Sequence, residues 1–289
     1  MTAEQALIRI YRQAAARLRR QIAADLANDR IGTATYRSQQ LASIQRELNA
    51  LGQRTRALAQ PASITEYLRG VRWVELNTPP ALQQIAFSGT HRRAAETLAH
   101  NLSGRLQLTT TVVGRRVEDV YRHVGLEVVS EGVVEGATRR EVSAQLRQQL
   151  IRDGVTDATT GFIDAAGRRW PLDTYAEMAV RTGTREAMSA GMENRLAETG
   201  EDLVTISDHN TECEICKPYE GETFSISGNT PGYDVLPEWP PFHPNCMHYA
   251  TPGSGDLEAD IQALNREFED PEQVQRHVER VLRGGLVPA

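Results

Sequence analysis

The spacing of apolar positions predicts two long amphipathic helices at the start of the chain. Over residues 3–28, apolar side chains recur every three or four positions and so share one helix face. The same spacing runs over residues 33–58, after the turn-forming sequence NDRIG. The sequence QPAS at residues 60–63 is expected to end the second helix, because proline disrupts a helix interior. The pattern therefore indicates a helical hairpin.

Helical patterns continue to about residue 152. Residues 64–110 are mostly helical in pattern, with a start at Pro79–Pro80, and residues 113–134 predict a further helix. Thr138 precedes Glu141 by three positions, which is the spacing of a capping box at a helix N-terminus. The first half of the chain is thus expected to be almost entirely helical.

The pattern changes after residue 155. The sequence GFIDAAGRRWPL predicts a β-hairpin with its turn at residues 165–167, and Asp173 is expected to cap a helix over residues 174–198. EDLVTIS predicts a strand. The tail from residue 256 onward is polar, with one helix beginning at Pro271. The predicted fold is mainly α, a helical N-terminal region followed by a small α+β C-terminal module.

Four consecutive segments follow from these patterns. They are a basic helical hairpin or arm (1–60), a helical domain (61–155), an α+β module (156–255) and a polar helical tail (256–289). No stretch approaches 18 consecutive apolar residues, and the N-terminus lacks the apolar core of a signal peptide. We therefore expect a protein that is made in the cytoplasm and has no membrane partner.

Charge is distributed unevenly along the chain. The net charge is −6, but residues 1–60 hold ten arginines against four acidic residues, a local balance of +6. A basic helical segment of this kind can contact nucleic acid or an acidic protein surface. The alternative is a solvated arginine face without a partner, and the sequence leaves both open.

All three cysteines lie within one segment rich in proline and glycine. Cys213 and Cys216 form a C-x2-C pair, and His243 and Cys246 form an H-x2-C pair 26 residues later. Two short chelating turns with three thiolates and one imidazole suit a tetrahedral zinc ion, and four protein ligands leave no open position, as in a structural site. His248 is an alternative to His243 or an outer residue that orients the site. The intervening segment is expected to bury little apolar surface, so a metal would stabilise it.

A disulfide, reduced thiols packed without metal and a catalytic Cys/His pair are the alternatives to a metal site. An odd number of cysteines and a reducing cytosol disfavour the disulfide. The packed thiols and the catalytic pair both stay open. A zinc deaminase requires an H-x-E sequence before a P-C-x-x-C sequence. The H-x-E of this chain, His277 to Glu279, follows the cysteines, and no P-C-x-x-C is present, which excludes a zinc deaminase. The sequence also lacks the usual phosphate-loop, metalloprotease and serine-hydrolase motifs.

RTGTRE at residues 181–186 indicates ion pairs within one helix.

The order of motifs after residue 160 resembles that of the phage minor capsid protein 2 family, which is related to the Mu F-like and SPP1-like head morphogenesis proteins. The motifs are GFIDAAGRRWPLDTYAEM, RTGTRE, a strand ending in Ser and His, CEICKPYEGETFSISG, and FHPNCMHYATP. The resemblance covers about residues 160–252. Met247 stands where the family usually has arginine.

The resemblance implies a structural, non-enzymatic protein of a tailed-phage head, located in the capsid interior or at the portal vertex of the virion. It implies the portal and major capsid proteins as partners and a role in head assembly. DNA packaging or ejection, and non-specific contact of the basic arm with packaged DNA, are further expectations. A cytoplasmic zinc-module protein that binds nucleic acid is the alternative, and a zinc-dependent nuclease or hydrolase is a weaker one.

Overall fold

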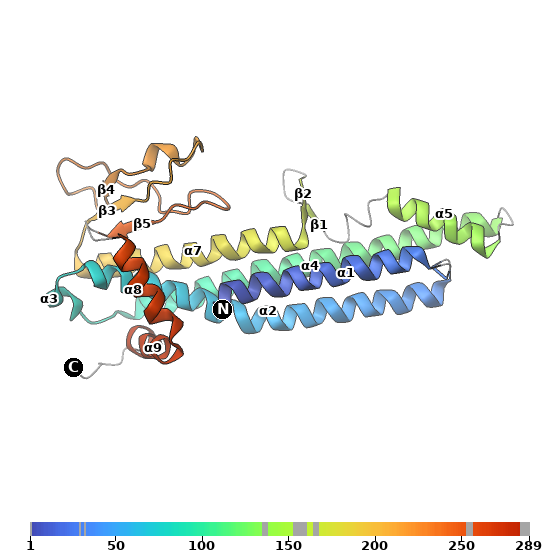
Figure 1. Ribbon diagram of the computed structural model, residues 1–289, viewed down its shortest axis with the longest axis horizontal. Helices are drawn as coiled ribbons and strands as arrows, with labels where there is room; N and C mark the ends of the chain where they lie inside the picture. Colours follow the sequence, from blue (N-terminus) through green and yellow to red (C-terminus); the bar gives the residue numbers. More distant parts are fainter. Residues whose placement is uncertain are drawn as a thin grey trace. The chain divides into compact units, whose positions relative to one another are not determined.

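Figure 1 shows a computed structural model, which describes residues 2–28, 30–31, 33–134, 138–152, 161–163, 168–252 and 257–283. Helices dominate these residues, and two small antiparallel sheets accompany them. The predicted fold class, mainly α with a small α+β C-terminal module, is therefore confirmed. Within these ranges, no helix is both long and apolar enough to cross a membrane.

The first two predicted helices are present, but the second is longer than expected. α1 spans Ala3–Ala27, and α2 spans Ala34–Asn77 and continues through Pro61. The predicted helix end at residues 60–63 is therefore wrong. An internal proline costs a helix about 3 kcal/mol. Burial of the turns that follow offsets this cost, since Tyr67, Leu68 and Val71 are almost completely buried.

The middle of the chain forms fewer and longer helices than the pattern suggests. α3 is a single turn, Pro80–Gln83, and α4 runs without a break from Gly89 to Val134. The predicted boundary near residues 110–113 is absent because Leu106, Val113 and Val117 continue one buried stripe. α5 spans Arg139–Arg152. Its capping box is confirmed, since the Thr138 amide donates to Glu141 at 2.7 Å and the Glu141 amide donates to the Thr138 hydroxyl at 3.3 Å.

The C-terminal half contains both sheets. β1 (Gly161–Ile163) pairs with β2 (Arg169–Pro171) as the predicted hairpin, whose turn lies outside the described residues. α7 spans Leu172–Thr199, so Asp173 lies in its first turn and is not its cap. β3 (Leu203–Ile206) is the central strand between β4 (Thr223–Ser225) and β5 (Ala250–Pro252). α8 (Leu257–Glu269), which the sequence pattern missed, precedes α9 (Pro271–His277) and the π-helix η2 (Val278–Leu282).

The chain divides into two compact units, each built from separate stretches of sequence. The helical unit comprises Gln5–Leu58 and Gly104–Glu177, and the sheet unit comprises Met1–Glu4, Ala59–Ser103 and Met178–Ala289. Both units take residues from α2, α4 and α7. The division into four consecutive segments, which rests on sequence pattern alone, stays a prediction.

In the helical unit, α1 lies beside both α2 and α4 (Figure 1). Tyr11 of α1 joins the three helices, because its hydroxyl donates to the Leu106 carbonyl at 3.0 Å and accepts from the Thr55 hydroxyl at 3.1 Å. Asp25 accepts hydrogen bonds from the hydroxyls of Tyr36 and Tyr121, both at 3.1 Å. These buried polar contacts fix the register of α1 against its two neighbours.

In the sheet unit, α2 and α7 approach each other closely at two glycines. A Cβ atom at Gly70 would lie 1.9 Å from the Met188 carbonyl oxygen, and one at Gly191 would lie 2.0 Å from the Tyr67 carbonyl oxygen. Only glycine fits at either position. The sheet shares its apolar cluster with the same two helices, through Trp73, Val74, Met192, Leu196, Val204, Ile206 and Phe224. α7 is therefore held rigidly where its outer residues meet the cysteine-containing loops.

Candidate metal centre

The first two cysteines lie on one tight turn after β3. The amides of Cys216 and Lys217 both donate to the Cys213 carbonyl, at 3.1 and 2.9 Å. The Cys213 amide donates to the Thr211 hydroxyl at 3.1 Å, and the short 3-10 helix η1 (Lys217–Tyr219) follows. This turn brings both thiols to the same side of the loop, as the C-x2-C spacing predicts.

The second turn holds His243 and Cys246 and is attached to α7. The Cys246 amide donates to the His243 carbonyl at 3.0 Å, and Asn245 between them has a left-handed φ of 63°. The Asn245 amide donates to the Thr182 hydroxyl at 3.3 Å, and the Arg185 guanidinium donates to the Cys246 carbonyl. α7 thus positions this turn through the motif RTGTRE, so the prediction that its charges pair within the helix is wrong for Arg185.

A third contact fixes the approach to this turn. Ser189, one turn further along α7, donates its hydroxyl to the Pro240 carbonyl at 2.5 Å. The side of α7 that carries Thr182, Arg185 and Ser189 therefore holds the segment from Pro240 to Cys246 at three places. A backbone without regular secondary structure is kept in one conformation by polar side chains from a rigid helix.

The structure brings together the thiols of all three cysteines and the rings of two histidines. The ligand atoms of Cys213, Cys216 and His243 lie within 4.8 Å of one another, and so do those of Cys216, Cys246 and His248. His243 Nε2 lies 3.0 Å from Cys216 Sγ and 3.5 Å from Cys213 Sγ. Cys216 Sγ lies 3.8 Å from Cys246 Sγ, and Cys246 Sγ lies 3.5 Å from His248 Nδ1.

The ligand atoms form two groups of three that share Cys216, and most separations within them are those of a tetrahedral zinc site. Zinc with bonds of about 2.3 Å to sulfur and about 2.1 Å to nitrogen separates its ligand atoms by about 3.5–3.8 Å. Three of the four separations lie in that range, and the fourth, between Cys216 and His243, is shorter. The centre could therefore bind a metal, and soft thiolate ligands favour zinc among the common divalent ions.

The surroundings of Cys216 and Cys213 shift the pKa values of their thiols in opposite directions. Burial raises the pKa of the Cys216 thiol to about 12, and the adjacent thiols of Cys246 and Cys213 contribute to this rise. Hydrogen bonds from the backbone amides of Cys216 and Ile215 lower the pKa of Cys213. All three cysteines are free thiols. A bound cation would compensate the negative charge that three adjacent thiolates concentrate in a largely buried site.

The two histidines are oriented differently. His243 Nδ1 lies 2.9 Å from the Pro244 carbonyl oxygen, so a proton there leaves Nε2 as an acceptor toward two thiols. His248 is buried, and its Nε2 lies 2.7 Å from the Glu220 carboxylate. Both are arrangements in which one ring nitrogen is held so that the other can bind metal. His243 contacts two thiols and His248 contacts one.

Glu220 also fixes the loop before the first turn. Its carboxylate accepts from the amides of His209 and Thr211, each at 3.0 Å at the nearest oxygen. Burial by itself would raise the pKa of Glu220, but the hydrogen bonds from His248, Thr211 and His209 lower it overall. An ionised Glu220 therefore joins the ring of His248 to the loop that precedes Cys213.

The segment between the two turns is better packed than its composition suggests. Phe224 and Leu236 belong to the buried cluster of the sheet unit, and Trp239 packs against it. Tyr219 and Phe242, which adjoin the two turns in sequence, stack with ring centroids 4.5 Å apart. The expectation that this segment buries little apolar surface is therefore wrong. Aromatic packing brings the turns together, and a metal would lock the ligands in place.

The predicted ligands Cys213, Cys216, His243 and Cys246 all lie at this centre, together with His248. Whether they bind metal, and which histidine completes the set, stays a prediction. Sequence reasoning missed the polar residues that position the ligands, Thr182, Arg185, Ser189 and Glu220. The motif RTGTRE is visible in the sequence, but nothing in its spacing indicates a partner 61 positions away.

Comparison with known families accounts for the motif order. The sequence model of a family described as phage minor capsid protein 2 matches residues 2–284, which is nearly the whole chain. The chain belongs to the phage minor capsid protein 2 family. Membership of this family gives the chain a structural role in the phage particle.

The family match extends well beyond residues 160–252, where the motifs are distinctive, and includes the helical first half of this minor capsid protein. No curated protein and no solved structure matches the chain. The family is recognised through its sequence model, which covers nearly the whole chain.

Proposed function

We propose that this minor capsid protein is a head component that assembles with the portal and major capsid proteins of a tailed phage, in the capsid interior or at the portal vertex. The observation that carries the proposal is the family match over residues 2–284. A role in DNA packaging or ejection belongs to the same proposal. Long helices joined by buried polar contacts suit a protein that must keep its shape in a large assembly.

Within this function, the Cys/His centre acts as a structural zinc site. Cys213, Cys216, Cys246 and His243 supply four ligands, which leaves no coordination position for a substrate. Its attachment to α7 through Arg185, Thr182 and Ser189 supports a structural role, because metal binding would then stabilise the loops and the helix as one body.

Quantitative mass spectrometry of purified virions tests the proposal. We expect the chain in the particles at low copy number, and cross-links from it to the portal or the major capsid protein. Particles made by a phage that lacks the gene should be defective in assembly or in DNA content, and a copy supplied in trans should restore them. Absence of the chain from purified particles would exclude a virion component.

A paired substitution links the metal centre to assembly. Cys216→Ser removes a central ligand, whereas Lys217→Gln changes an exposed neighbour. We expect only Cys216→Ser to reduce both the zinc content and the incorporation of the chain into particles. Normal incorporation of zinc-free protein would show that assembly does not depend on the centre.

A further inference from the structure

The positive charge of the protein is concentrated in one unit. The helical unit contains 20 arginines and 14 acidic residues, whereas the sheet unit contains 12 basic and 24 acidic residues. The helical unit therefore carries +6 and the sheet unit −12. A polyanion would be attracted to the helical unit and repelled by the sheet unit.

Several arginines of α1 are already used in ion pairs. Arg12 pairs with Glu177 at 2.5 Å, Arg17 with Glu47 at 2.6 Å and Arg19 with Asp173 at 2.8 Å. These acidic partners partly neutralise the basic face of α1 that the sequence predicts. Further guanidinium groups of the helical unit lie on α2 and α4.

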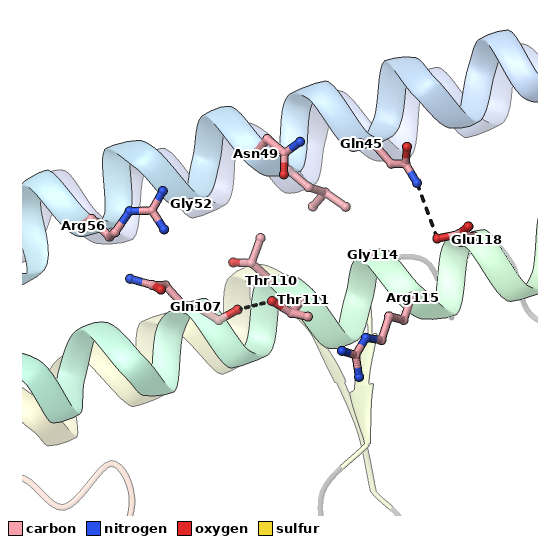
Figure 2. A pocket seen from close by; sticks show the side chains of 11 residues that line it. Gln45, Asn49, Gly52, Arg56, Gln107, Thr110, Thr111, Gly114, Arg115 and Glu118 are labelled. Carbon is pink, nitrogen blue, oxygen red and sulfur yellow. Dashed lines mark hydrogen bonds between the residues drawn. The ribbon is translucent and has the colours of Figure 1, made fainter.

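A groove runs between α2 and α4 of the helical unit (Figure 2). It comprises two cavities, one of about 420 Å³ and one of about 330 Å³, and Gln45 lines both. Together they follow α2 from Ala34 to Arg56, a length of about 33 Å at 1.5 Å per residue. The groove is open beside Gly52 and narrow beside Gly114, where an added Cβ atom would lie 3.2 Å from Leu48 Cδ1. A Cβ atom at Gly52 would have no neighbour within 4 Å.

The groove is lined mainly by cationic and neutral polar side chains. Arg37, Arg56, Arg115 and Arg122 line it, and Glu118 is its one acidic residue among those described. Glu118 pairs with Arg122 at 2.7 Å and accepts from Gln45 at 3.4 Å. Arg56 and Arg115 are exposed and make no ion pair or hydrogen bond with any residue that the structure describes.

The view in Figure 2 shows how these side chains lie. Thr110 projects from α4 into the space between the helices, and Arg56 and Asn49 lie along the edge of α2 that faces α4. Arg115 projects from α4 at the outer rim, away from α2. Charged and neutral hydrogen-bond donors therefore line the groove and its outer edge.

We propose that the groove between α2 and α4 binds the phosphodiester backbone of nucleic acid, with Arg56 as a phosphate ligand at the groove and Arg115 as a second one at its outer edge. Phosphate contacts are made by arginine together with hydroxyl and amide side chains, which is the composition of this lining. A docked peptide would require exposed apolar surface for its anchors, and the large apolar residues of the lining, Leu41, Leu48 and Tyr121, are all buried. Backbone recognition of this kind is independent of sequence and sensitive to salt.

This inference rests on the proposed location beside packaged DNA and assigns that contact to a site. The test uses the isolated full-length chain with a fluorescein-labelled duplex of about 30 base pairs and mixed sequence, and fluorescence anisotropy measured over a series of salt concentrations. The virion experiment above is independent of it, so either proposal can fail alone.

We expect Arg56→Gln with Arg115→Gln to raise the Kd for the duplex about tenfold and to reduce the slope of log K against log salt by about 2. Arg20→Gln with Arg46→Gln is the matched control. It removes the same charge from exposed arginines of the same unit that do not line the groove. The control should change the Kd less than about twofold. Arg56→Lys with Arg115→Lys keeps the charge and should retain most of the slope.

Three results would overturn the proposal. The first is that the native chain does not bind the duplex. The second is that both pairs of glutamine substitutions weaken binding equally. The third is that a labelled glutamate peptide of about 20 residues binds as tightly as the duplex and is released by the same groove substitutions. The last result would assign the groove to an acidic peptide.

Discussion

The guanidinium of Arg185 on α7 donates a hydrogen bond to the backbone carbonyl of Cys246, although the two residues are 61 positions apart. This contact joins a rigid helix to the second ligand turn. Removing it by Arg185→Ala is expected to lower the free energy of unfolding by about 1.5–3 kcal/mol, the usual worth of a hydrogen bond to a charged group. Chemical denaturation of the zinc-loaded chain measures this loss.

Arg181→Ala is the matched control for this experiment, because Arg181 is an exposed arginine one turn away on the same helix. It should change the free energy of unfolding by less than about 0.5 kcal/mol. Equal effects of the two substitutions would mean that Arg185 acts only through the charge of α7.

Glu220 is expected to tune metal binding through the ring of His248. Glu220→Gln replaces the carboxylate that lies 2.7 Å from His248 Nε2 and should lower zinc affinity about 10-fold. Glu222→Gln, at an exposed position nearby, should leave affinity unchanged. Competition with a zinc-binding dye measures both. If Glu220→Gln left the zinc affinity unchanged, His248 and Glu220 would not contribute to metal binding.

Gly191 is expected to tolerate no side chain. In Gly191→Ala the new methyl group meets the Tyr67 carbonyl oxygen, so α2 and α7 must separate, at a cost of about 3 kcal/mol or more. Gly104→Ala adds a methyl group in the middle of α4 with no atom within 4 Å, and should stabilise the chain by about 0.5–1 kcal/mol. Thermal unfolding distinguishes the two. A neutral Gly191→Ala would contradict the close approach.

Glu66 should make stability depend on pH. Burial raises its pKa to about 7, even though Arg69 acts in the opposite direction. Between pH 4.5 and 7 the folded chain keeps a proton that the unfolded chain has released, so stability falls as pH rises through that range, by about 1–3 kcal/mol. Below and above this range, Glu66 contributes no slope.

Glu66→Gln removes the titrating group and should flatten the stability curve between pH 4.5 and 7. Denaturation with urea at several pH values measures this. If the substituted chain keeps the same slope, another group is responsible for the pH dependence.

The sequence predicts helices well where one apolar stripe decides the structure. Leu7, Leu18 and Ile22 are buried, as their spacing in α1 predicts. The sequence predicts the ends of helices less well. Pro61 is a strong local signal for a break, but buried residues beyond it outweigh the local cost. Such an outcome depends on tertiary contacts that no local pattern contains.

The candidate ligands could be recognised because two thiols or a thiol and an imidazole close together in sequence must lie close together in space. The residues that position these ligands could not be recognised from the sequence. Ser189 and Pro240 are 51 positions apart, and only the fold brings them together. The glycines at the crossing of α2 and α7 carry no signal in the sequence either, because a helical glycine indicates a close approach only once the partner helix is known.

The zinc content of the purified chain tests the central claim most directly. Protein prepared freshly under reducing conditions, without added metal, is analysed by native mass spectrometry and elemental analysis. The four-ligand centre predicts about one zinc per chain, and its removal by a chelator should lower the unfolding temperature. A folded, fully reduced chain without metal, with the same unfolding temperature before and after addition of zinc, would contradict the account.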